Sequence, residues 1–278
     1  MAGLLRIGEL SRRTGVPPEV LWAWESRYGV LRPERSSGGF RLYSEDDVRR
    51  IETMQRLIGG GVSAGEAARA SLAEQAASSS PPAMRIAELA AAVDALDEGA
   101  AHAVLDAAIA DLSTDALLST LVLPLLGDLG RRWESGDVSI AHEHFASTLL
   151  RGRLLGLARG WGRGGTPHAL LACAPDEEHD LPLIALGLAL RARGVRVTSL
   201  GARTPYESLE DAVAQLRPDI CVVSATLPLS GRGEKLLRSI AGRTRLAFGG
   251  PGVDPRFAAR VGGEALVGDP IEAADLLS

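Results

Sequence analysis

The strongest constraint on the fold is a regular alternation of two sequence patterns that begins at His168. Short apolar runs alternate with stretches of helical periodicity, and the runs are, in order, HALLAC, VRVTSL, DICVVSA, RLAFGG and EALVG. Strands that alternate with helices in this way form a doubly wound parallel sheet. We therefore predict a Rossmann-like (flavodoxin-like) α/β domain over residues 164–278. Ligands bind such a sheet at the carboxyl ends of its strands, near the point where the strand order reverses.

Two helical regions precede this domain. Residues 84–163 are rich in Ala and Leu, with apolar positions three or four apart, which predicts a small four-helix-bundle-like domain. Residues 1–76 form an arginine-rich head. Between these two regions, residues 77–83 are rich in Ser and Pro, and we expect a linker there because such a sequence does not continue a helix.

Composition limits the partners and the cellular compartment that we expect for this chain. The net charge of −5 does not indicate a nucleic-acid binder, but arginines and acidic residues nearly balance within 1–76, so charge is judged domain by domain. No apolar run reaches the roughly 18 residues that cross a bilayer, and the N-terminus has no signal-peptide pattern. Cys173 and Cys221 stand in separate apolar runs and are expected to be buried thiols. We therefore expect a cytoplasmic protein with no membrane partner.

The head has the pattern of a winged helix-turn-helix. Helical periodicity over 6–14 and 19–28 is interrupted by the turn Gly15-Val16-Pro17-Pro18. The glycines of 29–43 then allow a tight hairpin, which would be the wing. Ser44 precedes three acidic residues, which predicts the N-terminus of another helix.

The arginines of the head are candidates for contacts with double-stranded DNA. We expect Arg35, Arg41 and Tyr43 of the wing to contact phosphates, which position a protein on a duplex. The alternative is that the arginines form a solvated face, while aromatic residues such as Trp24 and Tyr28 build a small core. The full set of candidate DNA-binding residues is Arg12, Arg13, Trp22, Arg27, Arg35, Arg41 and Tyr43.

These residues resemble the MerR family of transcriptional regulators. The matching patterns are W-E-x-R-Y-G at 24–29 and R-P-x-R-x-x-x-G-x-R-x-Y at 32–43, followed by the acidic helix start. The resemblance implies binding to operator DNA. Many relatives carry Arg two residues before the Trp, where this chain has Trp22. Trp22 cannot hold a phosphate as Arg does, so the operator sequence stays open.

A candidate ligand site lies where the strands of the predicted sheet end. His179 follows the first strand in the loop PDEEHDLP, Ser224 and Thr226 flank the end of the third, and Gly249-Gly250 ends the fourth. Small residues at these ends would leave a deep slot, and a His at its mouth could ligate a metal. A nearby carboxylate, Glu177 or Asp176, would then hold the other imidazole nitrogen. The alternative for His179 is an ordinary exposed loop residue.

The same residues resemble the base-off, His-on cobalamin-binding domains. The family pattern is D/E-x-H-x-x-G, then S-x-(L/T/S), then G-G, and its matches here are Glu177, His179, Ser224, Thr226, Gly249 and Gly250. This resemblance implies that His179 is the lower axial ligand of cobalt. Pro182 stands where the pattern has Gly, which could re-aim the His179 loop or tighten the slot.

The bundle carries a second pattern, in which Trp133 is followed at W-x9-E-H spacing by Glu143-His144. With the head and the sheet, it resembles the CarH and LitR family of light-responsive repressors. That resemblance implies adenosylcobalamin as cofactor, with Trp133, Glu143 and His144 capping its adenosyl group. It also implies a DNA-binding homotetramer in the dark that dissociates in light. The alternatives are a buried anchor for Trp133 and a surface pair for Glu143-His144.

One departure concerns the residue directly after the capping Trp. The family uses a His there to ligate cobalt in the light state, and this chain has Glu134. We therefore expect a photoproduct without two histidine ligands, unless His142 or His144 substitutes through a shift of the bundle.

Other functional classes share parts of this pattern. A corrinoid carrier or methyltransferase-associated protein also combines a helical cap with this sheet, and a haem, bilin or redox sensor could use the same fold. A methyl carrier has no need of a wing and a recognition helix, so we expect a regulator and no enzymatic activity.

Overall fold

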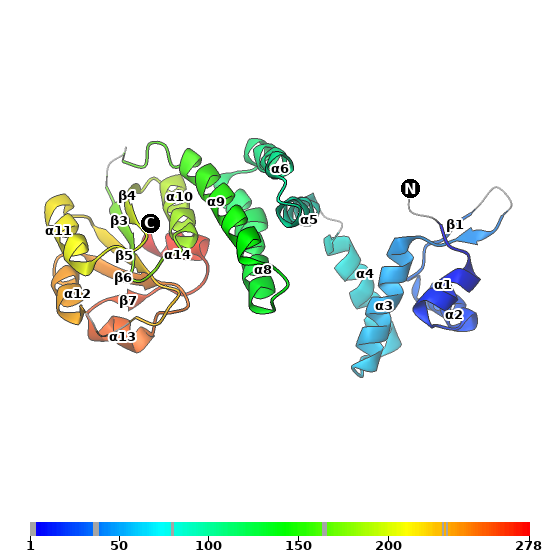
Figure 1. The fold of residues 1–278 in the computed structure, drawn as a ribbon. Coiled ribbons are helices and arrows are strands. Elements are labelled where there is room, and N and C mark those ends of the chain that lie inside the picture. The colour runs from blue at the N-terminus through cyan, green and yellow to red at the C-terminus, as the bar shows by residue number, and fades with distance from the viewer. Residues whose placement is uncertain (1–3, 36–38, 79–80, 163–165, 230, 232) are drawn as a thin grey trace. The chain divides into compact units, whose positions relative to one another are not determined.

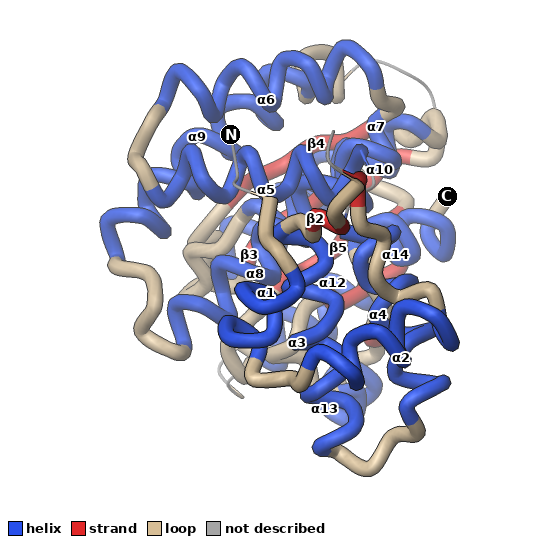
Figure 2. The backbone as a smooth tube through the Cα atoms, turned by 90° about the vertical axis from the view of Figure 1, so that its right-hand side faces the viewer, coloured by secondary structure: helices blue, strands red, loops and turns tan. Residues whose placement is uncertain are grey.

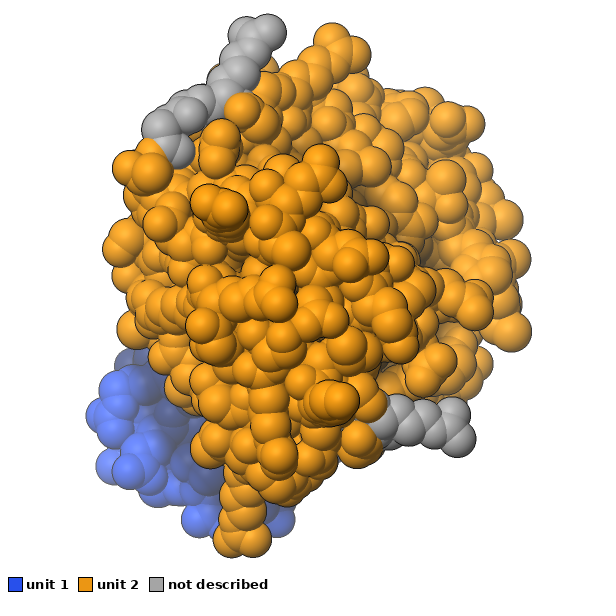
Figure 3. Space-filling view, turned by 90° about the vertical axis from the view of Figure 1, so that its left-hand side faces the viewer, with its two compact units in different colours: residues 1–84 blue, residues 85–278 orange. Residues whose placement is uncertain are grey.

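A computed structural model describes most of the chain and divides it into two compact units, 1–84 and 85–278 (Figure 3). The described residues are 4–35, 39–78, 81–162, 166–229, 231 and 233–278.

The head has the predicted helix-turn-helix and wing. Gly15, at φ +70°, ends the first helix, and Pro18 begins the second, where its missing N–H costs no hydrogen bond. Ser44 and Asp47 form a capping box at the N-terminus of the third helix. The elements of the head are α1 (Ile7–Thr14), α2 (Pro18–Tyr28), β1 (Glu34–Arg35), β2 (Arg41–Leu42), α3 (Glu45–Gly59) and α4 (Ala64–Ser78) (Figure 1).

The expected linker over 77–83 overlaps the ends of two helices. Helix α4 continues to Ser78, and α5 already begins at Pro81, so only residues 79–80 fall outside the described helices. The alanine-rich end of α4 favours helix, and prolines are tolerated in the first turn of α5. Residues 79–80 of the expected linker lie outside the described residues.

The helical domain follows as predicted. Its elements are α5 (Pro81–Asp94), α6 (Glu98–Asp111), α7 (Thr114–Leu117), the π-helical turn η1 (Leu118–Val122), α8 (Leu123–Glu134) and α9 (Ile140–Leu157). The segments α7, η1 and α8 succeed one another without a break. Their buried leucines, with those of α9, form one apolar core.

The α/β domain has the predicted parallel sheet, in the order β4-β3-β5-β6-β7. The strands are β3 (His168–Cys173), β4 (Arg196–Gly201), β5 (Ile220–Ser224), β6 (Arg245–Gly249) and β7 (Glu264–Ala265), drawn in red in Figure 2. The order reverses between β3 and β5, so the carboxyl ends of these two strands mark the expected binding edge.

Helices cover both faces of this sheet. On one face lie α10 (Leu181–Ala192) and α14 (Pro270–Leu277), and on the other lie α11 (Tyr206–Leu216), α12 (Glu234–Ala241) and α13 (Pro255–Arg260) (Figure 1). Cys173 and Cys221 are free and buried, as predicted, and burial raises the pKa of each thiol to about 12. Among the described residues, no helix is long and apolar enough to cross a membrane.

The helical domain and the sheet share one apolar core on the α10 face. Trp161, just after α9, packs so closely on α10 that a Cβ at Gly187 would lie 2.6 Å from the indole Cη2. Arg193 also forms an ion pair between the two domains, because its Nη2 lies 3.1 Å from Oδ2 of Asp115. The two domains therefore form one compact unit.

Candidate functional site

The loop between β3 and α10 is built around the carboxylate of Glu177. Its side chain is only 2% exposed. Oε1 accepts a hydrogen bond from the backbone N–H of His179 at 2.7 Å and lies 2.6 Å from Nδ1 of the same residue. Oε2 accepts hydrogen bonds from the hydroxyl of Thr226, at 2.5 Å, and from its backbone N–H. Of the two carboxylates considered from sequence, Glu177 contacts the imidazole.

The hydrogen bonds to Glu177 keep it ionised. Burial raises its pKa, but donors from Thr226 and His179 outweigh that effect and lower the pKa to about 2. An ionised carboxylate at 2.6 Å favours the tautomer of His179 in which Nδ1 carries the proton. Nε2 then keeps its lone pair, and the His179 side chain is 65% exposed. This is the arrangement of a metal-binding histidine with a carboxylate behind it.

The ends of the neighbouring strands lie beside this loop. Ser224, which is buried, is in register with Cys173 on one side and Gly249 on the other. A Cβ at Gly249 would have 3.9 Å to its nearest neighbour, whereas one at Gly250, where φ is +103°, would lie 2.3 Å from the carbonyl oxygen of Ala225. Gly250 is therefore required for the close approach of two loops, while Gly249 leaves space.

Pro182 lies in the first turn of α10. Proline is well tolerated at that place because its missing N–H has no intrahelical partner there. The contact between Glu177 and His179 forms with Pro182 present. The departure from the family pattern is thus accommodated by the start of the helix.

The helical domain approaches this loop through one stripe of α9. Glu143, Ser147 and Arg151 are four residues apart and share a face of the helix. The Ser147 hydroxyl donates to Oε1 of Glu143 at 2.6 Å, and Nε of Arg151 donates to Oδ1 of Asp180 at 2.8 Å. Because Asp180 follows His179, Glu143 belongs to the stripe of α9 that reaches the His179 loop.

His144 lies at a different place on α9. Its exposed imidazole has Nε2 3.5 Å from Oε2 of Glu143, and it lines a groove between α6 and α9 with Phe145 and His102. Trp133, near the end of α8, is 54% exposed, which contradicts the alternative of a buried anchor. Glu143 therefore shares the face of α9 on which Arg151 contacts the loop, whereas His144 borders a separate groove.

In the head, Glu25 organises the wing. Its Oε1 accepts a hydrogen bond from Nε of Arg41 at 2.9 Å, and its Oε2 accepts one from the Tyr43 hydroxyl at 2.9 Å. The sequence analysis missed this role, although Glu25 stands inside the W-E-x-R-Y-G pattern. Arg35 and Arg41 face each other in the hairpin, and both are exposed.

The expected phosphate contact of Tyr43 is corrected. Its side chain is fully buried, and burial together with the hydrogen bond to Glu25 raises the pKa of its hydroxyl. A backbone bridge to Leu5 holds it in the core of the head. Tyr43 therefore positions Glu25 and, through it, Arg41. The partial burial of Trp24 and Tyr28 agrees with the alternative considered for them.

The other candidate DNA-binding residues lie on the surface of the head. Trp22 projects from α2 with 49% of its surface exposed. The Arg27 guanidinium lies 5.7 Å from the ring centre of Tyr28. Arg12 pairs with Glu9, and Arg13 pairs with Glu45 at 2.5 Å. Exposed ion pairs contribute little free energy, so these arginines can exchange their partners for phosphates.

Three family models match the chain. Residues 5–73 match the MerR HTH family regulatory proteins, and residues 85–155 and 167–274 match two B12 binding domain models. The matches confirm the predicted order of a winged helix-turn-helix, a helical domain and an α/β domain.

Two relatives and one solved structure extend the comparison. The HTH-type transcriptional repressor CarH of Myxococcus xanthus is 40% identical over 232 residues, which span 79% of this chain and 78% of that protein. CarA of the same organism is 38% identical over 224 residues, or 79% and 76% of the two chains. The monomethylamine corrinoid protein of Methanosarcina barkeri has a TM-score of 0.58 at 16% identity and covers 70% of this chain and 97% of its own, which shows a shared fold alone.

Proposed function

We propose, from the premise that this chain belongs to the family of MerR-type regulators with B12-binding domains that includes CarH and CarA, that it is a light-sensing transcriptional repressor. It would bind double-stranded operator DNA through the head and adenosylcobalamin between α9 and the sheet. The observation that carries the proposal is the contact of Glu177 with Nδ1 of His179, which leaves Nε2 free.

The residues at the edge of the sheet fit a cobalamin. Neutral imidazole is a good ligand for a transition metal, and a carboxylate behind it fixes the tautomer and raises its basicity. Glu177 and Thr226 would hold His179 in this orientation, and Ser224, Gly249 and Gly250 would border the slot. When bound, adenosylcobalamin would supply a cobalt–carbon bond that light can cleave.

The stripe of α9 would close the site from the side of the helical domain. Glu143 would accept hydrogen bonds from the adenosyl group, and Trp133 would cover its apolar surface. Arg151 would keep α9 close to the loop through its hydrogen bond to Asp180. His144 would cap the group only after a rotation away from the groove that it now borders.

The oligomeric state of the protein would depend on whether the cofactor is intact. A ligand held between α9 and the sheet favours one arrangement of these elements, and its loss favours another, so that surfaces shared between copies change. We propose a homotetramer on the operator in the dark and smaller species in light. The protein would act in the cytoplasm and carry out no enzymatic reaction.

The corrinoid-carrier alternative rests on the fold alone. The shared fold with the corrinoid protein fits carriage of a cobalamin equally well. The matched MerR region, which extends over residues 5–73, favours regulation because a carrier has no use for it.

An absorption spectrum of the full chain reconstituted with adenosylcobalamin in the dark tests the proposal. We expect His179→Ala to shift the spectrum toward that of the free cofactor and to weaken binding. His142→Ala is the matched control, because His142 lies in the helical domain with Nδ1 2.7 Å from the Ser139 hydroxyl. An unchanged dark spectrum in His179→Ala would show that the ligand is another group.

A further inference from the structure

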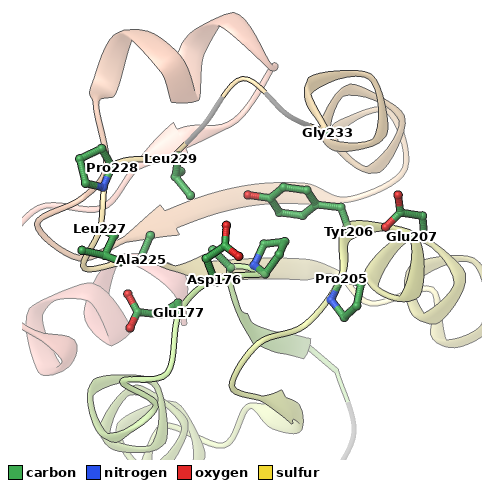
Figure 4. Close-up of a pocket in the computed structure, with 12 residues that line it drawn as sticks. Asp176, Glu177, Pro205, Tyr206, Glu207, Ala225, Leu227, Pro228, Leu229 and Gly233 are labelled. Carbon is green, nitrogen blue, oxygen red and sulfur yellow. The ribbon is translucent and has the colours of Figure 1, made fainter.

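A second pocket opens at the reversal point of the sheet, on the face covered by α11 and α12 (Figure 4). It encloses about 280 Å³ between the loops that follow β3 and β5 and the start of α11. The helices α10 and α14 cover the opposite face. Glu177 borders this pocket and also holds His179, so the two sites share one residue.

The pocket is lined by the hydroxyl of Tyr206, which makes no hydrogen bond to the described residues. Tyr206 is 7% exposed, and among the residues that the structure describes its hydroxyl has no hydrogen-bond partner. Figure 4 shows this hydroxyl directed toward Asp176 and Leu229. Burial, followed by the charge of Asp176, raises the pKa of Tyr206 to about 12, so the hydroxyl stays protonated. The hydroxyl is accessible from the pocket, so a ligand there can pair with it.

The ring of Tyr206 is held firmly in this position. A Cβ at Gly233 would lie 2.2 Å from Cδ2 of the ring, so only glycine allows the ring to pack there. The direction of the hydroxyl is therefore fixed by the fold. A fixed donor at the bottom of a pocket orients a ligand without loss of side-chain freedom.

The described charged residues at the mouth of the pocket are acidic. Asp176 and Glu207 are exposed on its rim, and within the described part of the chain neither carboxylate has a hydrogen-bond or ion-pair partner. The adjacent Glu178 differs, because its Oε1 lies 2.8 Å from Nη1 of Arg203. No Lys or Arg occurs among the described lining residues. Asp176 and Glu207 therefore favour a cation between them.

The walls of the pocket are apolar. Leu227, Leu229, Pro205 and Pro228 line it between the charged rim and Tyr206. Among the described residues, no group of three His, Cys, Asp or Glu side chains could hold a metal ion. The lining thus fits an organic body better than a bare ion.

We propose that this pocket binds a small organic cation with two polar ends. An amine would lie between Asp176 and Glu207, a short apolar chain would contact Leu227 and Leu229, and a second polar atom would pair with the Tyr206 hydroxyl. The binding of this cation does not require a cobalamin, so it can be tested independently of the proposed function.

The experiment is isothermal titration calorimetry of the full, cobalamin-free chain with three probes of equal length. These are 4-amino-1-butanol, 1-aminopentane, which lacks the hydroxyl, and 1,4-butanediol, which lacks the charge. We expect 4-amino-1-butanol to bind most tightly and the diol least. Asp176→Asn combined with Glu207→Gln should weaken binding of the amino alcohol about tenfold, as expected for two exposed ion pairs.

Tyr206→Phe isolates the contribution of the hydroxyl, because the ring against Gly233 is retained. Binding of 4-amino-1-butanol should weaken about fivefold, the effect of one hydrogen bond, while binding of 1-aminopentane stays unchanged. Glu178→Gln is the matched control on the same loop and should change neither affinity. No binding of either amine at millimolar concentration, equal binding of the diol, or Mg²⁺ binding that is lost in the rim variants would overturn the proposal.

Discussion

Glu177 and His179 are two residues apart in the chain, and the Oε1 atom of the first lies 2.6 Å from Nδ1 of the second. Thr226, from the loop after β5, donates to the other oxygen of the same carboxylate. The contact therefore links the ends of two neighbouring strands at the point where the order of the sheet reverses. It fixes the imidazole before any ligand arrives, which reduces the entropy that ordering would cost on binding.

Substitution of Glu177 should weaken cobalamin binding without removing the ligand. Glu177→Gln keeps the shape but gives Nδ1 no negative partner, so the tautomer and the basicity of His179 are less well defined. We expect the affinity for cobalamin to fall about 10- to 100-fold, the usual effect of losing a carboxylate behind a metal-bound histidine. Equilibrium titration followed by absorbance measures it. Glu178→Gln, on the same loop, should bind as the unaltered protein does.

The same carboxylate makes stability depend on pH. The pKa of Glu177 is lowered from 4.5 to about 2 in the folded chain, so its contribution to the free energy of unfolding is present above pH 4.5 and is lost as the pH falls toward 2. The full shift corresponds to about 3 kcal/mol. Denaturant unfolding of unit 85–278 within the intact chain, followed between pH 6 and pH 3, should show about 2 kcal/mol of this loss. A Glu177→Gln variant with the same pH dependence would contradict it.

The two arginines of the wing should act on DNA mainly through phosphates. Loss of one phosphate contact weakens binding to all sequences and reduces the slope of log affinity against log salt by about 1. We expect this result for both Arg35→Ala and Arg41→Ala. Arg203→Ala, in the sheet domain, is the control and should leave the slope unchanged. Fluorescence anisotropy with operator and random duplexes at several salt concentrations measures both effects.

Tyr43→Phe should show whether Tyr43 positions Glu25 and Arg41 or contacts a DNA phosphate itself. The variant loses the hydrogen bond from the buried hydroxyl to Glu25, which destabilises the head by about 1 kcal/mol. Because Tyr43 is fully buried, the salt slope should stay that of the unaltered protein. If Tyr43→Phe reduced the salt slope as much as Arg41→Ala does, Tyr43 would contact a phosphate directly, contrary to its burial in the structure.

The elements that could be predicted from the sequence are those whose pattern lies within one short segment of the chain. The five strands and the loop that carries His179 follow from runs of apolar residues with helices between them. The choice between Asp176 and Glu177 could not be made, because adjacent side chains point in directions that the path of the loop decides. Tyr43 was misplaced because its bridge to Leu5, 38 positions earlier in the chain, draws it into the core. The pocket around Tyr206 likewise joins three separated segments.

The residue that follows Trp133 would decide how the cobalt is held after illumination. Glu134 is the final residue of α8 and is exposed. In the proposed function, a side chain near Trp133 would have to hold the cobalt once light has removed the adenosyl group. A carboxylate is a poorer partner for cobalt(III) than imidazole, so Glu134 does not replace a histidine. His142 is held by Ser139, and His144 borders the groove beside α6, so either would have to move.

We therefore expect the illuminated protein to lack the spectrum of a cobalamin held by two histidines. It should exchange added cyanide or imidazole faster than such a form would. Glu134→His should slow this exchange and red-shift the illuminated spectrum, while Glu134→Gln, which adds no imidazole, should leave both unchanged. Absorbance recorded after illumination, with and without cyanide, separates the variants. If the unaltered protein already gives a stable two-histidine spectrum, a histidine of α9 has reached the cofactor, and His142→Ala and His144→Ala would identify which one.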